Sequence, residues 1–407
     1  MNHKWKMGVI CFMALILLTP LGLGCAKEAE EGKVSVTIGH LTDMTGAAAS
    51  VGRPLLWALE DLVRHINEED PIPGVELKVV TYDIKLDPAR DIPGYEWVKE
   101  RGAKVIVALM SSTAEALKPF AARDKIPVAG LSVSTAMVEP PGWVFAFLPP
   151  LASQIRTLLD WISNEWDYAK GKPKIGCAGY ADAYGIDGER GMREYCLANQ
   201  DQFEYAGGYL APFGVMTWTS ETEKLRDCDY VFISALGGVA YVSYISESQG
   251  KGYAGKFIHA EGLAAFFDLL IEKCGWETLD GSLGLHSWGW WNETWPAVEL
   301  VKSLLYEYHP REAENVVYAG IGYIGGGLQQ LFFLEILRKA IEEVGAEDFD
   351  GQAFYDTAVE FKTTWEGYPE RGFTETRRYC VTEQLVYEFS AEAGDLVRRS
   401  DWIPIID

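Results

Sequence analysis

The sequence predicts an α/β fold of two doubly wound lobes, each a parallel sheet with helices on both faces. Three observations carry this prediction. The chain has 407 residues, which exceeds the usual domain size of ~100 to 150 residues. Hydrophobic residues make up 48% and charged residues 23%, which is the balance of a packed globular protein. Strand-like and helix-like segments alternate in order, and the alternation then restarts.

The first half alternates short apolar runs with amphipathic segments. Residues 34–41 read VSVTIGHL, a pattern typical of a buried strand. We predict a loop over 42–53 and a helix that begins at Pro54, because proline is favoured at the first helical position. Apolar residues then recur at helical spacing over 55–66. Further strands are predicted at 75–82, 104–110 and 126–131, and further helices at 96–101 and 113–123.

The second half repeats this rhythm without a detectable sequence repeat. The segment 281–295, GSLGLHSWGWWNETW, interrupts the pattern, and we predict that the chain crosses between the lobes there. Residues 377–389 are predicted to be extended. Strands are predicted at 174–179, 203–209, 229–235 and 256–260, and helices at 150–166, 188–198, 239–248, 263–274, 297–308, 328–344 and 353–365.

The N-terminus is predicted to be an export signal. Two lysines precede an apolar run at 8–18, which is shorter than the ~20 residues that span a bilayer. Gly24 before Cys25 resembles a bacterial lipoprotein cleavage site, and ordinary secretory cleavage near Ala26 is the alternative. We predict that Cys25 carries a lipid that anchors the body to the outside of the cell membrane. Residues 26–33 are polar and are predicted to be a flexible tether.

Composition argues against several classes of function. Thirty-six basic residues against 59 acidic residues give a formal net charge of -23, which argues against a surface that follows phosphate backbones, so we expect no nucleic-acid partner. The histidines and cysteines lack metal-ligand spacing, and nucleophile-elbow, HExxH and Walker motifs are absent. We therefore predict no metal, no cofactor and no enzymatic activity. The five cysteines after the leader are expected to be buried thiols: Cys177, Cys196, Cys228, Cys274 and Cys380.

One glycine motif suggests a nucleotide site but lacks the required context. Gly320, Gly322 and Gly325 match GxGxxG. A dinucleotide site needs this pattern between two strands of a βαβ unit, whereas here a long helix follows and no second strand is predicted. We interpret the glycines as positions of close backbone packing, or as room for a ligand beside Tyr323.

Polar residues stand where predicted strands end, and this is where doubly wound sheets bind ligands. Ser111 follows one strand of the first lobe, and Ser132 and Ser134 follow the next. Ser111 suits either a helix cap or a ligand contact. Glu261 follows a strand of the second lobe. Hydroxyls and helix amides suit a carboxylate and Glu261 suits an ammonium, so together they predict a site for a zwitterion.

These motifs, in their order from Val34 onward, resemble the leucine/isoleucine/valine-binding proteins of branched-chain amino-acid transport, in their lipoprotein form. The resemblance implies a type I periplasmic binding protein fold with a multi-strand hinge. It also implies an ATP-driven importer, whose permease and ATPase subunits would be the partners of a monomeric binding protein. The segments that carry it are 38–46 (IGHLTDMTG), 111–113 (SST), 132–135 (SVST), 183–185 (AYG), 260–263 (AEGL) and 322–323 (GY).

The resemblance implies a role for single residues. Ser111 matches the serine that holds the ligand carboxylate, Ser134 matches its threonine partner, and the backbone at Ser132 matches a further contact. Tyr184 matches the tyrosine that approaches from the second lobe, and Glu261 matches the glutamate that takes the α-ammonium. The implied ligand-binding residues are Ser111, Ser132, Ser134, Tyr184, Glu261 and Tyr323, the last as an aromatic beside the cleft.

The sequence departs from the family at two aromatic positions. Residues 49–52 read ASVG where amino-acid binders carry an aromatic, and Leu236 stands where they carry a tyrosine. These losses open the side-chain pocket, so we expect a ligand other than leucine. Four tryptophans offer two interpretations, a refilled pocket wall or packing between the lobes: Trp288, Trp290, Trp291 and Trp295.

We therefore predict capture of an amino acid or related amine-bearing carboxylate by closure of two lobes. The alternatives are an amide, a urea or an aromatic acid as ligand, a ligand sensor of the same fold, and an exported enzyme. The predicted parts are a signal peptide (1–25), a tether (26–33), lobe I (34–149 plus 290–376) and lobe II (150–289 plus 377–407).

Overall fold

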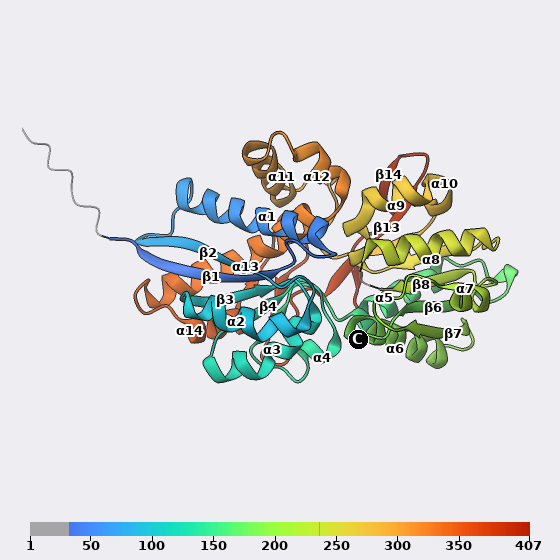
Figure 1. The fold of residues 1–407 in the computed structure, drawn as a ribbon, viewed down its shortest axis with the longest axis horizontal. Helices are drawn as coiled ribbons and strands as arrows, with labels where there is room; N and C mark the ends of the chain where they lie inside the picture. The colour runs from blue at the N-terminus through green and yellow to red at the C-terminus, as the bar shows by residue number, and fades with distance from the viewer. Residues whose placement is uncertain (1–31, 236) are drawn as a thin grey trace, which may run out of the picture.

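The computed structural model describes residues 32–235 and 237–407, which form two lobes side by side (Figure 1). The sheet of the first lobe has the order β2-β1-β3-β4-β5, and its neighbouring strands are parallel. This order places the first two crossover helices on opposite faces of the sheet. The strands are β1 (Val34–Thr42), β2 (Val75–Asp83), β3 (Ala103–Ala108), β4 (Val128–Gly130) and β5 (Val144–Ala146).

Helices cover both faces of this first sheet. The helix α1 packs against α13 on one face, and α2 packs against α3 on the other (Figure 1). The bounds are α1 (Ala49–Glu68), α2 (Asp91–Glu100), α3 (Ser111–Asp124), α4 (Thr135–Val138), α11 (Pro296–Tyr308), α12 (Ala313–Ala319), α13 (Gly322–Val344) and α14 (Gly351–Glu360). The short pair β11 (Lys362–Thr363) and β12 (Arg371–Gly372) follows α14.

The second lobe has a mixed sheet of order β14-β13-β10-β9-β8-β6-β7. Five strands are parallel, and β13 and β14 extend that sheet in antiparallel register. The strands are β6 (Lys174–Tyr180), β7 (Glu204–Ala211), β8 (Tyr230–Ser234), β9 (Lys256–His259), β10 (Leu283–His286), β13 (Glu383–Ser390), β14 (Asp395–Arg398) and β15 (Ile403–Pro404), which pairs with β13. The helices are α5 (Leu151–Glu165), α6 (Ala183–Ala198), α7 (Thr219–Lys224), α8 (Gly238–Gly250), α9 (Phe267–Cys274) and α10 (Trp276–Leu279), with the 3₁₀ helix η3 (Glu261–Phe266) before α9.

Three segments of the chain pass between the lobes and are tied to one another. The Ala146 N–H donates to the Arg378 carbonyl over 2.7 Å, and the Cys380 N–H donates back to the Ala146 carbonyl over 3.1 Å. The indole of Trp288 donates to the Phe147 carbonyl over 3.0 Å. The second crossing therefore bonds to the first, and the third bonds to the end of β5 from which the first begins, as expected of a multi-strand hinge. The crossings are 147–150, 287–295 and 373–382.

Several predicted boundaries were wrong; the helix predicted over 353–365, for example, ends at Glu360. The helix α1 begins at Ala49, so Pro54 lies inside it, where proline removes one helical hydrogen bond. The Asp43 carboxylate accepts the N–H groups of Gly46, over 2.5 Å, and Ala48, over 2.8 Å, and so orders the turn from which the helix starts. The segment 281–295 was predicted only as a crossing, yet it contains β10, which is buried and paired on both sides.

The GxGxxG motif serves close packing. It runs from the end of α12 into the first turn of α13 rather than following a strand, which is not the setting of a dinucleotide site. Gly320 has φ of +125°, and a Cβ there would lie 2.0 Å from the Ala264 carbonyl oxygen. At Gly326, the glycine directly after the motif, a Cβ would lie 2.0 Å from the Leu55 side chain. Glycine therefore lets α13 approach lobe II at one end and α1 along its length.

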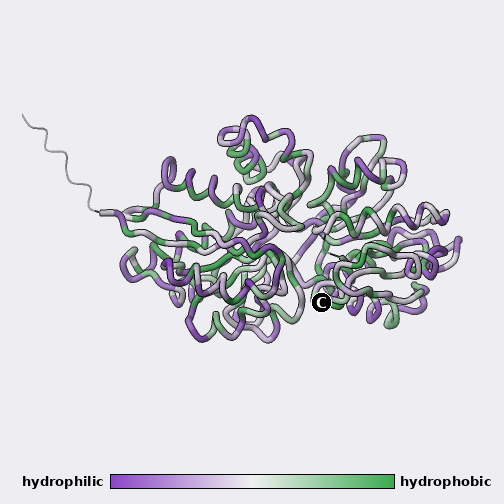
Figure 2. The backbone as a smooth tube through the Cα atoms, in the orientation of Figure 1, coloured by the Kyte–Doolittle hydropathy of each residue, from purple (hydrophilic) through white to green (hydrophobic). Residues whose placement is uncertain are grey.

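The core of each lobe lies on its strands. Hydrophobic stretches run through both lobes, while hydrophilic stretches gather on outer loops and helix surfaces (Figure 2). Trp288 and Trp291 are buried at the crossings, and the Trp291 indole donates to the Gly320 carbonyl over 2.9 Å. Trp290 is also buried and donates to the Asp395 carboxylate over 2.7 Å. Trp288, Trp290 and Trp291 therefore pack around the crossings, which favours packing over a refilled pocket wall for these three.

Membrane spans and metal clusters are absent from the part of the chain that the structure describes. No helix within 32–235 or 237–407 has the length and apolar character of a membrane span. The same ranges hold no group of three His, Cys, Asp or Glu side chains placed to share a metal ion. The five cysteines after the leader are free thiols, and all except the half-buried Cys274 are buried, as predicted for four of them.

Candidate functional site

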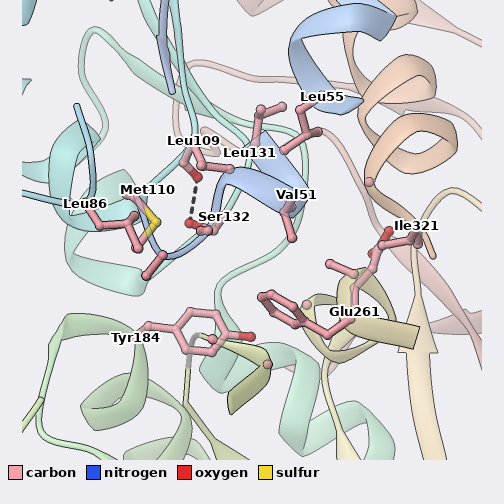
Figure 3. Close-up of a pocket in the computed structure, with 18 of the residues that line it drawn as sticks. Val51, Leu55, Leu86, Leu109, Met110, Leu131, Ser132, Tyr184, Glu261 and Ile321 are labelled. Atoms are coloured by element: carbon pink, nitrogen blue, oxygen red, sulfur yellow. Dashed lines mark hydrogen bonds between the residues drawn. The ribbon is translucent and has the colours of Figure 1, made fainter. Parts of the chain in front are cut away.

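A cavity of about 250 Å³ lies between the two lobes, at the carboxyl ends of their strands. Figure 3 shows residues of lobe I on one side of it and Tyr184 and Glu261 of lobe II on the other. Most of its wall is aliphatic or aromatic. Examples are Val51, Leu55, Leu109, Leu131 and Ile321. A cavity with this wall and a few polar groups is the usual form of a small-molecule site.

Glu261 is the acidic residue of this cavity. It begins η3 directly after β9, and its side chain is 3% exposed. One carboxylate oxygen, Oε2, accepts the Ser287 N–H over 2.9 Å, whereas Oε1 is buried without a hydrogen-bond partner among the described residues. Burial raises the pKa of Glu261 to about 7, against the lowering effects of its bond to Ser287 and of the nearby Arg371 charge. The site therefore holds a carboxyl group that titrates near neutrality.

Tyr184 faces the cavity from the first turn of α6. The Asp182 carboxylate caps that helix by accepting the Gly185 N–H over 2.7 Å, and this cap fixes the turn that carries the tyrosine. Burial raises the pKa of Tyr184, with further contributions from the charges of Asp182 and Glu261. The phenol is therefore neutral and available as a hydrogen-bond donor at physiological pH.

Ser132 is the hydroxyl of the lobe I wall. Its Oγ donates to the Leu109 carbonyl over 3.0 Å, the bond drawn in Figure 3, and it accepts the Ser111 N–H over 2.8 Å. This pair of bonds ties the end of β3 to the end of β4. The hydroxyl thus lies on the wall of the cavity while it holds two strand ends together.

Three other predicted residues lie behind the wall. Ser111 is the buried first residue of α3, and Ser134 caps α4 by accepting the Met137 N–H over 3.3 Å. Tyr323 donates to the Asp61 carboxylate over 2.6 Å. The phase of α13 explains the position of Tyr323, because the residues of this helix that face the cavity follow one helical stripe. That stripe is Gly322, Gly325, Gly326 and Gln329.

Two glutamines that were not predicted from the sequence line the cavity. The Oε1 atoms of Gln154 and Gln329 are buried and have no partner among the described residues, as is the case for Oε1 of Glu261. The amide of Gln154 is oriented by its donation to the Pro149 carbonyl over 2.8 Å. The helical spacing of Gln329 from Gly322 was the available signal for one of them. The cavity therefore has three acceptor oxygens that lack donors.

A polar contact joins the lobes beside the cavity. The Asp187 carboxylate on α6 accepts the N–H of Thr135 at the start of α4, over 3.1 Å, and the N–H of Ala152, over 3.1 Å. The Arg190 guanidinium bonds to Asp187 over 2.7 Å and to the Thr135 hydroxyl over 2.9 Å. We call this contact, made by Asp187, Arg190 and Thr135, the interlobe clasp. It holds the lobes in the arrangement that encloses the cavity.

The chain was compared with known proteins. The family described as Periplasmic binding protein matches residues 35–389, which is most of the chain. The chain belongs to this family. Periplasmic binding proteins are non-enzymatic, so the expectation that the chain is not an enzyme is confirmed. A search of curated proteins found no match.

Solved structures support the type I fold of this periplasmic binding protein. A branched-chain amino-acid ABC transporter protein from Thermus thermophilus with bound valine has a TM-score of 0.79 at 20% identity, covering 92% of this chain and 97% of that one. A fatty acid ABC transporter substrate-binding protein from Thermomonospora curvata has a TM-score of 0.76 at 15% identity, covering 91% of this chain and 92% of that one. A solute-binding protein from R. palustris in complex with 4-hydroxybenzoate has a TM-score of 0.74 at 15% identity, covering 91% of this chain and 97% of that one. The predicted fold, with two parallel-sheet lobes, is confirmed.

Two departures from the family pattern were expected at the cavity of this binding protein. Val51, from the segment 49–52 where the resemblance implies an aromatic, lines the cavity with an aliphatic side chain. The second departure, Leu236, lies outside the described residues, as do the signal peptide and Cys25.

Proposed function

We propose that this binding protein is the extracytoplasmic solute-binding component of an ABC importer. In this proposal it captures an amino acid or related amine-bearing carboxylate by closure of its two lobes, and delivers it to permease and ATPase subunits. The observation that carries the proposal is the buried Glu261 carboxylate with one unpaired oxygen.

The charge of the cavity favours an amine. Among the described residues that line it, Glu261 is the one with a formal charge, and the wall around it is mostly apolar. An ionised carboxylate in such surroundings is costly unless a cation and N–H donors accompany it. An ammonium group supplies both, and its three N–H groups suit a site in which Gln154 and Gln329 also present unpaired acceptors.

At the carboxylate end of the ligand Tyr184 is a hydroxyl donor, whereas the Ser132 hydroxyl already donates to the Leu109 carbonyl. Ser132 stands on the lobe I wall and Tyr184 faces it from lobe II. We propose that both contact the ligand, and that Ser111 and Ser134 act as positioning residues that hold the strand end and the α4 cap behind Ser132. Tyr323 then fixes the phase of α13 through its bond to Asp61.

A second candidate is an aromatic or aliphatic carboxylic acid. Its support is the same carboxyl group in its other protonation state, because burial raises the pKa of Glu261 to about 7. A protonated Glu261 is a hydrogen-bond donor to a ligand carboxylate, and the apolar wall suits such a ligand. The R. palustris and T. curvata proteins are described as binding 4-hydroxybenzoate and fatty acid.

Calorimetry with a matched pair of variants tests the proposal. A thermal-shift panel of amino acids, amides and aromatic acids first identifies ligands, because a ligand of the native state raises apparent stability. We expect Glu261→Gln to weaken amino-acid binding by roughly 10- to 100-fold, ~1.4 to 2.7 kcal/mol. The control Glu277→Gln, at an exposed site on α10, should leave affinity unchanged. Unchanged affinity in Glu261→Gln would remove the amine from the proposal and favour the second candidate.

We also propose that Cys25 carries the lipid anchor. Replacement by serine removes the thiol to which a lipid is attached, so the Cys25→Ser protein should be absent from the membrane fraction of the producing cells and appear in the soluble fraction. Retention of that variant in the membrane fraction would contradict lipidation at Cys25 without affecting the ligand proposal.

A further inference from the structure

The cavity continues onto an apolar rim on lobe II. Phe213 and Met216 stand in the segment between β7 and α7, and Val239 stands in the first turn of α8. All three line the cavity, yet they are 56%, 52% and 55% exposed. Single exposed apolar side chains are normal on a protein surface, whereas three at the margin of one cavity indicate a surface that something covers.

We propose that the ligand carries an apolar body longer than an aliphatic amino-acid side chain, and that this body lies along the rim while the amine binds Glu261. The inference rests on the proposed function and adds the size and shape of the ligand. Its class is that of α-amino acids or related amines with a long alkyl or extended aromatic part.

The apolar wall of the cavity supports this class. An apolar wall without ligand atoms against it forfeits dispersion contacts, so a ligand whose apolar part also covers the rim is favoured over one that ends inside the cavity.

The order of the strands places the charged and apolar ends of the site apart. Glu261 follows β9, and Phe213 follows β7. The sheet order β9-β8-β6-β7 separates them by three strand spacings, roughly 14 Å at ~4.8 Å each. Tyr184, after β6, lies between these two ends. The lobe II floor thus changes from a carboxylate to apolar side chains along one direction.

Lobe I presents a matching apolar surface. Its cavity residues after successive strands are Val51, Leu86, Met110 and Leu131, with Ser132 as the hydroxyl beside them. Figure 3 shows Leu86 and Met110 at one side of the cavity and Glu261 at the opposite side. An elongated ligand with one charged end therefore meets complementary groups along its whole length, on both lobes.

Calorimetry with straight-chain α-amino acids, from 2-aminobutyrate to 2-aminododecanoate, tests the inference. We expect affinity to rise by about fourfold for each added methylene group that is buried. The double variant Phe213→Ser/Met216→Ser should weaken the longest members by about tenfold or more and leave the shortest unchanged. The control Leu197→Ser, at an exposed position of α6 away from the cavity wall, should leave the series unchanged.

The outcomes separate this inference from the proposed function. Affinity that stops rising at the length of leucine, or a double variant that weakens all members equally, would overturn the long apolar body. In that case a loss of affinity in Glu261→Gln still supports amine binding. Fatty acids that bind in proportion to length and ignore Glu261→Gln would overturn the amine and leave the apolar body standing. A series with no binding member would overturn both.

Discussion

The pH dependence of ligand affinity follows from the position of Glu261. Burial raises the pKa of this carboxyl group to about 7. An ammonium ligand needs the ionised form, and at pH 5, two units below that pKa, only about 1% of Glu261 is ionised. The affinity for an amine should therefore fall about 100-fold between the fully ionised state and pH 5, a loss of about 2.7 kcal/mol. A carboxylic acid ligand requires the opposite sign, because it needs the protonated form.

The same shift affects folding stability with a definite sign. The folded pKa of Glu261 is about 7 and the ordinary value is 4.5. A raised carboxyl pKa stabilises the folded state below pH ~4.5, and this contribution is lost as pH rises to ~7, in total about 3 kcal/mol. Binding of an amine reverses the shift, because it favours the charged form. Complex formation near pH 6 should therefore release a proton.

Isothermal titration at pH 5, 6, 7 and 8, in buffers of different ionisation enthalpy, measures both effects. The native protein should bind its amine ligand more tightly at each step toward pH 8 and should release a proton at pH 6. The variant Glu261→Gln removes the titrating group and should bind weakly at every pH. Native affinity that is flat, or that rises toward acid, would refute the reasoning from Glu261.

Three further predictions concern the clasp, the hinge and the buried histidines. Asp187→Asn removes the charge that Arg190 and two N–H groups bind, so it should lower ligand affinity several-fold and expand the protein in small-angle scattering. The buried guanidinium of Arg371 donates to the Ser287 carbonyl, so Arg371→Met should lower the free energy of unfolding in urea by about 2 kcal/mol. Burial lowers the pKa of three histidines to about 3 or 4. Each should therefore lower the free energy of unfolding by about 2 kcal/mol as the pH falls from 7 to 5, and the raised pKa of Glu261 offsets part of this loss. Urea titrations at the two pH values measure the net change. The three histidines are His40, His259 and His286.

The strands that could be predicted are those with long apolar runs. Residues 34–41 and 104–110 predict β1 and β3 by composition alone, because strands buried on both faces need continuous apolar sequence. The strand β10 could not be predicted, since four residues that include Gly284 carry no periodic signal. Its strand conformation comes from its neighbours, β9 on one side and β13 on the other.

A site residue could be predicted where its place directly after a strand fixes its position at the cavity. Glu261 follows a strand of lobe II and lines the cavity as a strand-end argument requires, and Tyr184, which only the family resemblance implied, lines it as well. Ser134 obeys the same rule, yet its hydroxyl is taken by the cap of α4. Phe213 and Met216 could not be identified, because they stand in an irregular segment where neither periodicity nor a motif marks them. Their place at the cavity depends on the packing of whole lobes.

The charged end of the site is bonded directly to the hinge, and this has a consequence for closure. Glu261 accepts from the Ser287 N–H, and Ser287 belongs to the second crossing segment. The Ser287 hydroxyl accepts from Gln384 over 2.9 Å and its carbonyl accepts from Arg371 over 2.7 Å, which joins it to β13 and β12, the strands at the two ends of the third crossing. The carboxylate is thus held by the part of the molecule that moves least when two lobes rotate about their crossings. Phe213 and Met216 of the apolar rim follow β7, three strand spacings from Glu261. For the ligand proposed above, we therefore expect the charged end to meet a partner fixed at the hinge, and burial of the apolar body to stabilise the closed arrangement of the lobes.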